Sequence, residues 1–302
     1  SFLLNSCGEN ATVLKNKGID ALDKNEYSLS LDFFNQAIEK EPEFDEAFFN
    51  RGRCYFLMGE FNNALNDFDR ALEINPKNLP IFFNKGLCLI ELKNYKKALI
   101  CFSEIDSLEA QYPDLTLQKA NCHFKVGSYQ KAAANYTKAL SHFKDSTSIY
   151  LLRGSSYYQL GQYEKALSDL EYYIPLVENP NISIEYAAIS KFKLKDYSGS
   201  IIYFDKMIET GTVPVGENLK IMADALVFLA QEHIEEGDRD KALELLTRVT
   251  IIAPLNKSAF FYRGLLFLDM GRKTDACLDL NMALINGETK ALKALNYSCP
   301  EF

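Results

Sequence analysis

A repeat with a period of 34 residues dominates this sequence. Small side chains recur at that interval along the first two thirds of the chain, at Gly18, Gly52, Gly86, Ala120, Gly154 and Ala188. A second series of small residues follows twelve positions behind the first, at Ser30, Ala64, Ala98, Ala132, Ala166 and Ser200. After an insertion of eight residues, both series resume at Ala230 and Ala242 and again at Gly264 and Ala276. A fixed period of this kind indicates stacked units, so the 302 residues are expected to form eight repeats of one fold.

Each repeat has the pattern of two helices joined by a tight turn. In residues 45–78, apolar and small side chains recur at steps of three and four, first up to Phe56 and again from Phe61. This spacing places them on one face of a helix. Gly59 separates the two stripes, and glycine is the residue that best tolerates the left-handed backbone of such a turn. The sequence therefore predicts an all-α fold.

The second repeat carries the full pattern of a known family. Its bulky, small and aromatic residues stand at Phe48, Gly52, Tyr55, Ala64, Phe68, Ala71 and Pro76. In these residues the chain resembles the tetratricopeptide repeat (TPR) family, and the resemblance extends over eight copies in phase. It implies a right-handed α-solenoid of about eight helix-turn-helix units. The repeats are expected near residues 11–44, 45–78, 79–112, 113–146, 147–180, 181–212, 223–256 and 257–290.

Three segments fall outside the repeats. Residues 1–10 precede them, and residues 291–302 are expected to form a capping helix and tail that cover the open apolar face of the last repeat. An insertion at about 213–222 separates the sixth and seventh repeats. Part of it is expected to lengthen the next helix, because Asn218–Glu236 reads as one helical run. The insertion is either a tolerated surface addition or a contact for a partner.

Composition and motifs argue against nucleic-acid binding and catalysis. Lys and Arg number 33 against 41 Asp and Glu, for a net charge of −8, whereas nucleic-acid binding needs a basic face. No phosphate-binding loop, HExxH or CxxC motif is present. Of three histidines, His123 and His233 occupy a position that is an aromatic packing site in TPR proteins. We therefore expect a non-enzymatic protein without a metal or cofactor.

The cysteines are of two kinds. Cys54, Cys88 and Cys122 share one position of successive repeats, so we expect free thiols in the core. Their spacing fits no zinc site, and a disulfide framework belongs to much shorter chains. Cys7 follows an apolar run with Leu4 three residues before it, which resembles the end of a bacterial lipoprotein signal peptide. On that interpretation Cys7 is the lipidated residue; the alternative is an incidental cysteine.

A basic residue recurs at the seventh position of six repeats. The members of this series are Lys17, Arg51, Lys85, Lys119, Arg153 and Arg263. One interpretation is a track for an anionic ligand. We favour a structural role, in which the side chains lie along neighbouring helices and pair with carboxylates such as Asp67, Asp169 and Asp279.

The TPR resemblance also implies where a partner binds. In that family the first helices line a concave groove, and the side chains expected to face it here are Lys15, Phe49, Asn50, Arg53, Phe83, Asn84, Asn121, Tyr158, Tyr186 and Phe261, with Phe192 and Phe228 in the same row. The early repeats offer amides and bases, and the later ones offer more aromatic rings together with acidic groups. This suits a peptide whose acidic group lies toward the first repeats. Some relatives clamp a chaperone carboxylate, but Ile19, Pro80 and Asn84 stand at three of the five clamp positions, so this specificity is not expected.

These observations predict a scaffold or adaptor that binds a segment of another protein in its groove. No nucleic-acid partner is expected, and membrane contact is expected only through a lipid at Cys7. The lipoprotein interpretation places the protein in the bacterial cell envelope, lipid-anchored and facing the periplasm, as an assembly factor. The alternatives are a cytoplasmic co-chaperone-like adaptor and a regulatory subunit that senses a small ligand.

Overall fold

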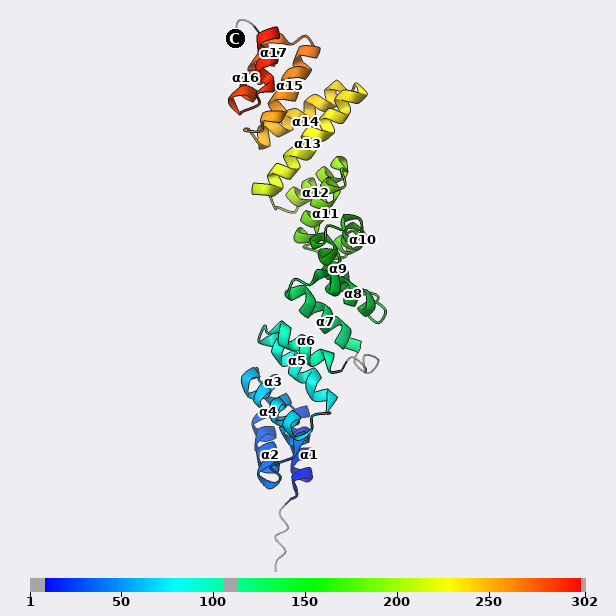
Figure 1. The fold of residues 1–302 in the computed structure, drawn as a ribbon, viewed down its shortest axis with the longest axis vertical. Helices are drawn as coiled ribbons and strands as arrows, with labels where there is room; N and C mark the ends of the chain where they lie inside the picture. Colours follow the sequence, from blue (N-terminus) through cyan, green and yellow to red (C-terminus); the bar gives the residue numbers. More distant parts are fainter. Residues whose placement is uncertain (1–8, 106–112, 300–302) are drawn as a thin grey trace, which may run out of the picture. The chain divides into compact units, whose positions relative to one another are not determined.

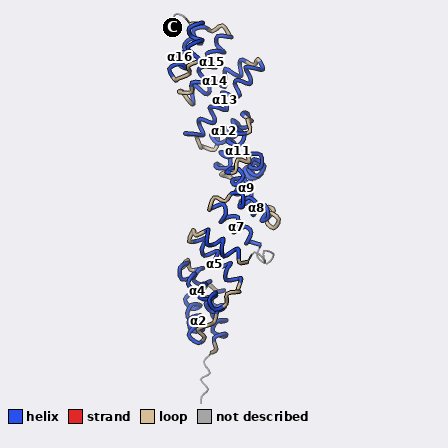
Figure 2. The backbone as a smooth tube through the Cα atoms, viewed as in Figure 1, coloured by secondary structure: helices blue, strands red, loops and turns tan. Residues whose placement is uncertain are grey.

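The computed structural model describes residues 9–105 and 113–299, and every regular element within them is helical (Figures 1 and 2). Cys7 lies outside the described residues. The elements are α1 (Ala11–Asp23), α2 (Tyr27–Lys40), α3 (Asp45–Leu57), α4 (Phe61–Ile74), α5 (Leu79–Glu91), α6 (Tyr95–Ser103), α7 (Pro113–Lys125), α8 (Tyr129–Ala139), α9 (Thr147–Gln159), α10 (Tyr163–Tyr173), the short 3-10 helix η2 (Ile174–Leu176), α11 (Asn181–Lys193), α12 (Tyr197–Glu209), α13 (Gly216–Glu236), α14 (Arg239–Ile252), α15 (Lys257–Asp269), α16 (Lys273–Ile285) and α17 (Lys290–Ser298).

The long helices form eight consecutive pairs, and α17 follows the last pair. The chain divides into two compact units, Ser1–Asp145 with α1–α8 and Ser146–Phe302 with α9–α17. In each unit the two helices of a pair pack on each other, and the second helix also packs on the first helix of the next pair. At the end of the second unit, α17 packs on α16 and α15. These contacts confirm the predicted α-solenoid of eight helix pairs with a capping helix.

A residue with left-handed backbone lies in the turn of every pair. Glycine occupies this position in five pairs, as at Gly59 with a φ of 79°. Asn25, Lys93 and Lys195 occupy it in the other three, with φ of 61°, 57° and 63°. A side chain with a Cβ costs energy in this conformation. Surrounding packing therefore imposes the turn even where the sequence lacks glycine.

One large side chain per repeat fills the space between the paired helices. The equivalent position of all eight second helices is fully buried, at Phe34, Phe68, Phe102, Tyr136, Leu170, Phe204, Leu246 and Leu280. The small residue of the first helix makes room for it. A Cβ added at Gly52 would lie only 2.7 Å from Cε1 of Phe68. The 34-residue series of small residues is therefore a packing requirement, since a larger side chain would overfill the contact.

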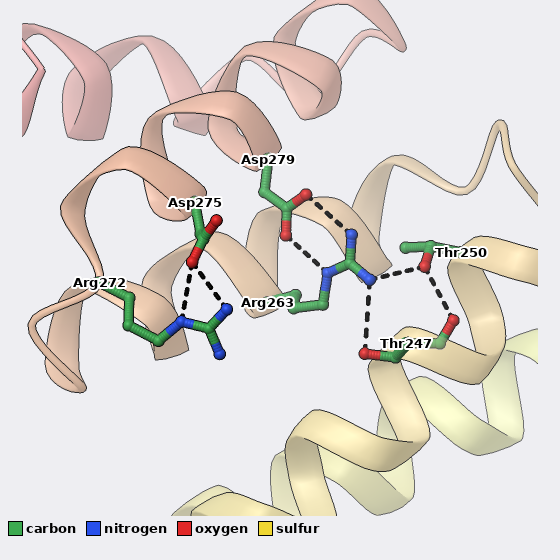
Figure 3. Close-up of polar contacts among 6 residues, drawn as sticks. All are labelled: Thr247, Thr250, Arg263, Arg272, Asp275 and Asp279. Carbon is green, nitrogen blue, oxygen red and sulfur yellow. Dashed lines mark hydrogen bonds and ion pairs between the residues drawn. The ribbon is translucent and has the colours of Figure 1, made fainter.

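Buried ion pairs join the two helices of one repeat, and in the last repeat the arginine also bonds to the repeat before it. In the last repeat, Nε and Nη2 of Arg263 donate to the two carboxylate oxygens of Asp279, at 2.6 and 2.9 Å (Figure 3). Nη1 of Arg263 donates to the hydroxyl of Thr250, on the preceding helix α14, at 2.8 Å. The same bidentate ion pair joins Arg51 to Asp67 and Arg153 to Asp169. The structural interpretation of this basic series is confirmed for these three arginines.

The C-terminal cysteines correct an expectation. Cys54, Cys88 and Cys122 are buried free thiols, as predicted. Cys277 and Cys299, however, form a disulfide. The bond joins α16 to the residue that follows α17, so it fastens the capping helix to the last repeat. Neither spacing nor periodicity indicates this pair, because Cys299 lies beyond the repeats.

The insertion between the sixth and seventh pairs lengthens a helix. α13 has 21 residues, whereas the other first helices have 13 each. It begins at Gly216, two residues before the expected Asn218. Within the two added turns, Ile221 and Met222 are buried in the core of the second unit. The added residues of α13 therefore contribute to the hydrophobic core of the second unit.

Candidate interaction site

The first helices of successive pairs lie next to one another within each unit. α1 contacts α3, α3 contacts α5 and α5 contacts α7; in the second unit α9, α11, α13 and α15 follow one another in the same way. Residues of these helices that are predicted to meet a partner therefore come from neighbouring elements. We call their exposed side the first-helix surface.

In the first unit, three predicted residues share one polar network with Glu46, and a fourth, Phe49, lies beside it. The ammonium of Lys15 on α1 pairs with the Glu46 carboxylate on α3 at 2.5 Å. The Asn50 side chain is buried; its Nδ2 donates to the Glu46 carbonyl at 2.8 Å, and its Oδ1 accepts from Arg53 at 3.0 Å. The Arg53 guanidinium lies 5.9 Å from the ring centre of Phe49. Lys15 therefore has a carboxylate partner inside the chain, and Asn50 orients Arg53.

Three further predicted residues of the first unit contact the fold beneath them. The Phe83 ring lies 6.0 Å from that of buried Phe102. The Asn84 Nδ2 donates to the Pro80 carbonyl one turn earlier, at 2.9 Å. Asn121 accepts a 2.9 Å hydrogen bond from the buried Tyr136 hydroxyl. Each of the two amides thus makes a hydrogen bond within its own repeat. The Phe83 ring packs on the ring of the core residue Phe102.

In the second unit the structure brings aromatic rings into direct contact. Tyr158 on α9 and Tyr186 on α11 stack face to face, with ring centres 4.2 Å apart and planes 12° apart. Phe228 on α13 stacks on Tyr197 at 5.0 Å, and Phe192 lies 6.3 Å from Phe228. Phe228 remains 40% exposed. Rings on adjacent first helices therefore form two groups that reach solvent. We call these groups, Tyr158 with Tyr186 and Phe192 with Tyr197 and Phe228, the aromatic clusters.

Sequence reasoning missed one member of these clusters. Tyr197 begins α12 and stands three residues before the small residue of that helix. The aromatic at this position recurs in most repeats and was interpreted only as part of the repeat pattern. The signal for this cluster is Phe228, an aromatic residue at the position where the early repeats carry Asn50 and Asn84. Phe261, by contrast, contacts Tyr262 at 5.4 Å and packs against the core under the capping helix.

The Tyr158 phenol in the first aromatic cluster is uncharged at physiological pH. Burial is the main cause that raises the pKa of Tyr158 to about 12, with neighbouring Tyr186 adding to the effect. The phenol of Tyr158 is therefore protonated in any ordinary buffer. An uncharged ring of this kind can pack on apolar or aromatic groups through its face.

The described residues show no constellation suited to metal binding. Across 9–105 and 113–299 there is no group of three or more His, Cys, Asp or Glu side chains that could hold an ion. His123 is half-buried and its pKa is lowered, first by burial and then by Lys131 and Lys119. In the same part of the chain, no helix combines the length and apolar character needed to cross a bilayer.

Comparison with known proteins identifies the repeats. Three family profiles, each described as tetratricopeptide repeat, match residues 45–78, 68–100, and both 117–179 and 229–291. A tetratricopeptide repeat protein from Parabacteroides merdae is 18% identical in sequence, with a TM-score of 0.50 over 85% of this chain and 98% of that one. MamA from Desulfovibrio magneticus is 16% identical, with a TM-score of 0.51 over 57% of this chain and 97% of that one. No curated protein sequence matches significantly. The chain belongs to the tetratricopeptide repeat family.

Proposed function

We propose that this protein is a non-enzymatic scaffold that binds a segment of a partner protein on its first-helix surface. The observation that carries the proposal is the pair of aromatic clusters on α9, α11 and α13. Aromatic side chains with one face packed and one face open give much binding energy at low entropic cost. Partly exposed rings on adjacent helices are therefore well placed to anchor apolar side chains of a partner.

The first unit offers different chemistry for the same partner. Arg53 makes no ion pair within the described residues, and Asn50 holds its guanidinium beside Phe49. An acidic group of the partner would complement this cation. That the partner carries an acidic group facing the first repeats remains a prediction. Lys15 is expected to contribute less than Arg53 to binding this group, because Glu46 already neutralises its charge.

A photo-cross-linking residue in place of Tyr186 tests the aromatic site. The control is the same residue in place of Tyr172, which also contacts another tyrosine ring and is 42% exposed, but lies on the second helix α10. We expect a cross-link to a defined partner segment from position 186 and none from position 172. With that partner in hand, Tyr186→Ala should weaken binding by roughly 30-fold, as expected for an aromatic anchor, and Tyr172→Ala should not. Equal effects of the two variants would contradict the proposed site.

Charge reversal tests the first unit separately. Arg53→Glu, alone and with Lys15→Glu, should weaken binding of the same partner while far-ultraviolet circular dichroism remains unchanged. The single change is expected to produce most of the effect, because Lys15 is already paired. Full-strength binding by the double variant would exclude this surface.

We further propose that the protein works in the bacterial cell envelope, anchored by a lipid at Cys7. The Cys277–Cys299 disulfide supports an oxidising compartment, since disulfides persist there and are rare in the reducing cytosol. The four free cysteines within the described residues are buried, which protects them from oxidation. Acyl labelling and membrane fractionation of wild type beside Cys7→Ser test the anchor. Lipid on the wild type alone supports it; no label on either favours the cytoplasmic adaptor.

A further inference from the structure

We propose that a second binding site lies between the two added turns of α13 and the α14–α15 connection, away from the aromatic clusters. Its occupant is a partner-protein segment in which a large apolar side chain stands next to a carboxylate. This goes beyond the scaffold function above and gives the insertion a specific role.

The site is a cavity of about 350 Å³, within the range of roughly 300–1,000 Å³ typical of ligand sites. Leu219, Lys220 and Ala223 of α13 form one wall. Ile252, Leu255 and Asn256 stand opposite them, at the end of α14 and in the connection that follows. The α13 wall consists of residues that the insertion adds, together with Ala223. A repeat of ordinary length would have no such wall, so the cavity exists because of the insertion.

The walls are apolar and reach solvent. Ala223 is buried at 1% exposure, whereas Leu255 is 80% exposed at the rim. Val215, which precedes α13, is 72% exposed, and Ile251, which precedes the opposite wall, is 74% exposed. Val215 and Ile251 do not line the cavity, but exposed apolar residues near an apolar hollow are typical of a protein interaction site. The size and openness suit a side chain that enters from a partner's surface.

The side-chain polar groups of the walls include two donors, on Lys220 and Asn256. Lys220 is the charged residue of the walls. Asp224, one turn further along α13, interacts electrostatically with Lys220, and Glu217 lies on the same helix; neither acid forms part of the walls. Asn256 uses its Oδ1 to accept from the Ala259 amide at 3.0 Å, which leaves its Nδ2 as a second donor. An ammonium and an amide N–H beside apolar walls complement a carboxylate attached to an apolar group.

The test uses two small probes that differ only in charge. N-acetyl-phenylalanine carries the apolar ring and the carboxylate, and N-acetyl-phenylalanine amide carries the ring alone. Each is titrated into the full chain and followed by backbone amide shifts. We expect both to shift residues 219–223 and 252–256, and the amide to bind about threefold more weakly, as one exposed ion pair would give.

Variants on exposed positions make the result specific. Lys220→Gln should abolish the difference between the probes, and Leu255→Ser should weaken both. The matched controls are Lys273→Gln and Ile285→Ser, two exposed changes in the same unit, which should alter neither. Tyr186→Ala should also leave probe binding unchanged, so failure here and failure of the first-helix surface are distinguishable.

Three results would overturn the proposal. One is the absence of probe-induced shifts around this cavity. Another is a difference between the probes that survives in Lys220→Gln. The third is binding of octanoate at this cavity without binding of N-acetyl-phenylalanine, which would assign the site to a fatty acid instead of a protein segment.

Discussion

Asp279 is 6% exposed, and both of its carboxylate oxygens accept hydrogen bonds from the guanidinium of Arg263. The same arginine reaches the hydroxyls of Thr247 and Thr250 on the preceding repeat, at 3.4 and 2.8 Å. One buried carboxylate thus positions a side chain that links two repeats. Because each repeat of a solenoid is stabilised largely by its neighbours, such links matter for the cooperativity of the array.

Asp279→Asn is expected to lower the free energy of unfolding by about 3 kcal/mol, because it leaves a buried guanidinium without its anion. The control is Asp275→Asn. Asp275 pairs with Arg272 at 2.8 Å in the same view (Figure 3), but both side chains are nearly half exposed. That change should cost less than about 1 kcal/mol. Urea denaturation measures both, and equal losses would show that burial of the pair is unimportant.

Lys93→Gly is expected to stabilise the protein by about 1 kcal/mol. Lys93 has a φ of 57° in the turn between α5 and α6, a conformation that costs a residue with a Cβ energy and costs glycine little. Gly59→Lys at the equivalent turn should have the opposite sign. A Cβ at Gly59 would meet nothing within 4 Å, so that change reports on the backbone alone. Thermal unfolding gives both shifts; a lower melting temperature for Lys93→Gly would contradict the argument.

His123 is expected to make the protein less stable in mild acid. Its pKa is lowered in the folded state by burial, Lys131 and Lys119, so the unfolded chain binds the proton more readily. The stability contribution is complete above the unfolded pKa of about 6.5 and is lost as pH falls from there toward the lower folded value. His123→Phe should therefore show a smaller drop in melting temperature between pH 7.5 and 5 than wild type. His142→Gln, which removes an exposed histidine, is the control; identical profiles for wild type and His123→Phe would refute this.

Loss of the disulfide is expected to loosen the capping helix. The bond closes a loop between residues 22 positions apart, which corresponds to about 3 kcal/mol of stabilisation. The double variant Cys277→Ser, Cys299→Ser should show faster amide hydrogen exchange in α17 and a lower melting temperature. A reductant should lower the melting temperature of wild type and leave the double variant unchanged. A reductant effect of the same size on both would locate the sensitivity elsewhere.

The sequence by itself determined the repeating part of this protein. Residues equivalent to Gly52 and Phe68, and to Arg51 and Asp67, recur at the same separation in other repeats. The sequence pattern therefore indicates each of these contacts several times. Helix pairs, turns, core and ion pairs follow from that periodicity, because equivalent residues in stacked units occupy equivalent environments.

Only the tertiary structure decided the contacts that occur once. Cys299 meets Cys277 because α17 folds back on α16, and no repeat unit contains both. Glu46 neutralises Lys15 across two helices, and Tyr197 joins Phe228 from the next repeat. The cavity beside Lys220 likewise needs the added turns of α13 and a distant connection together. Such contacts depend on how one particular segment packs in space, for which a period along the sequence carries no information.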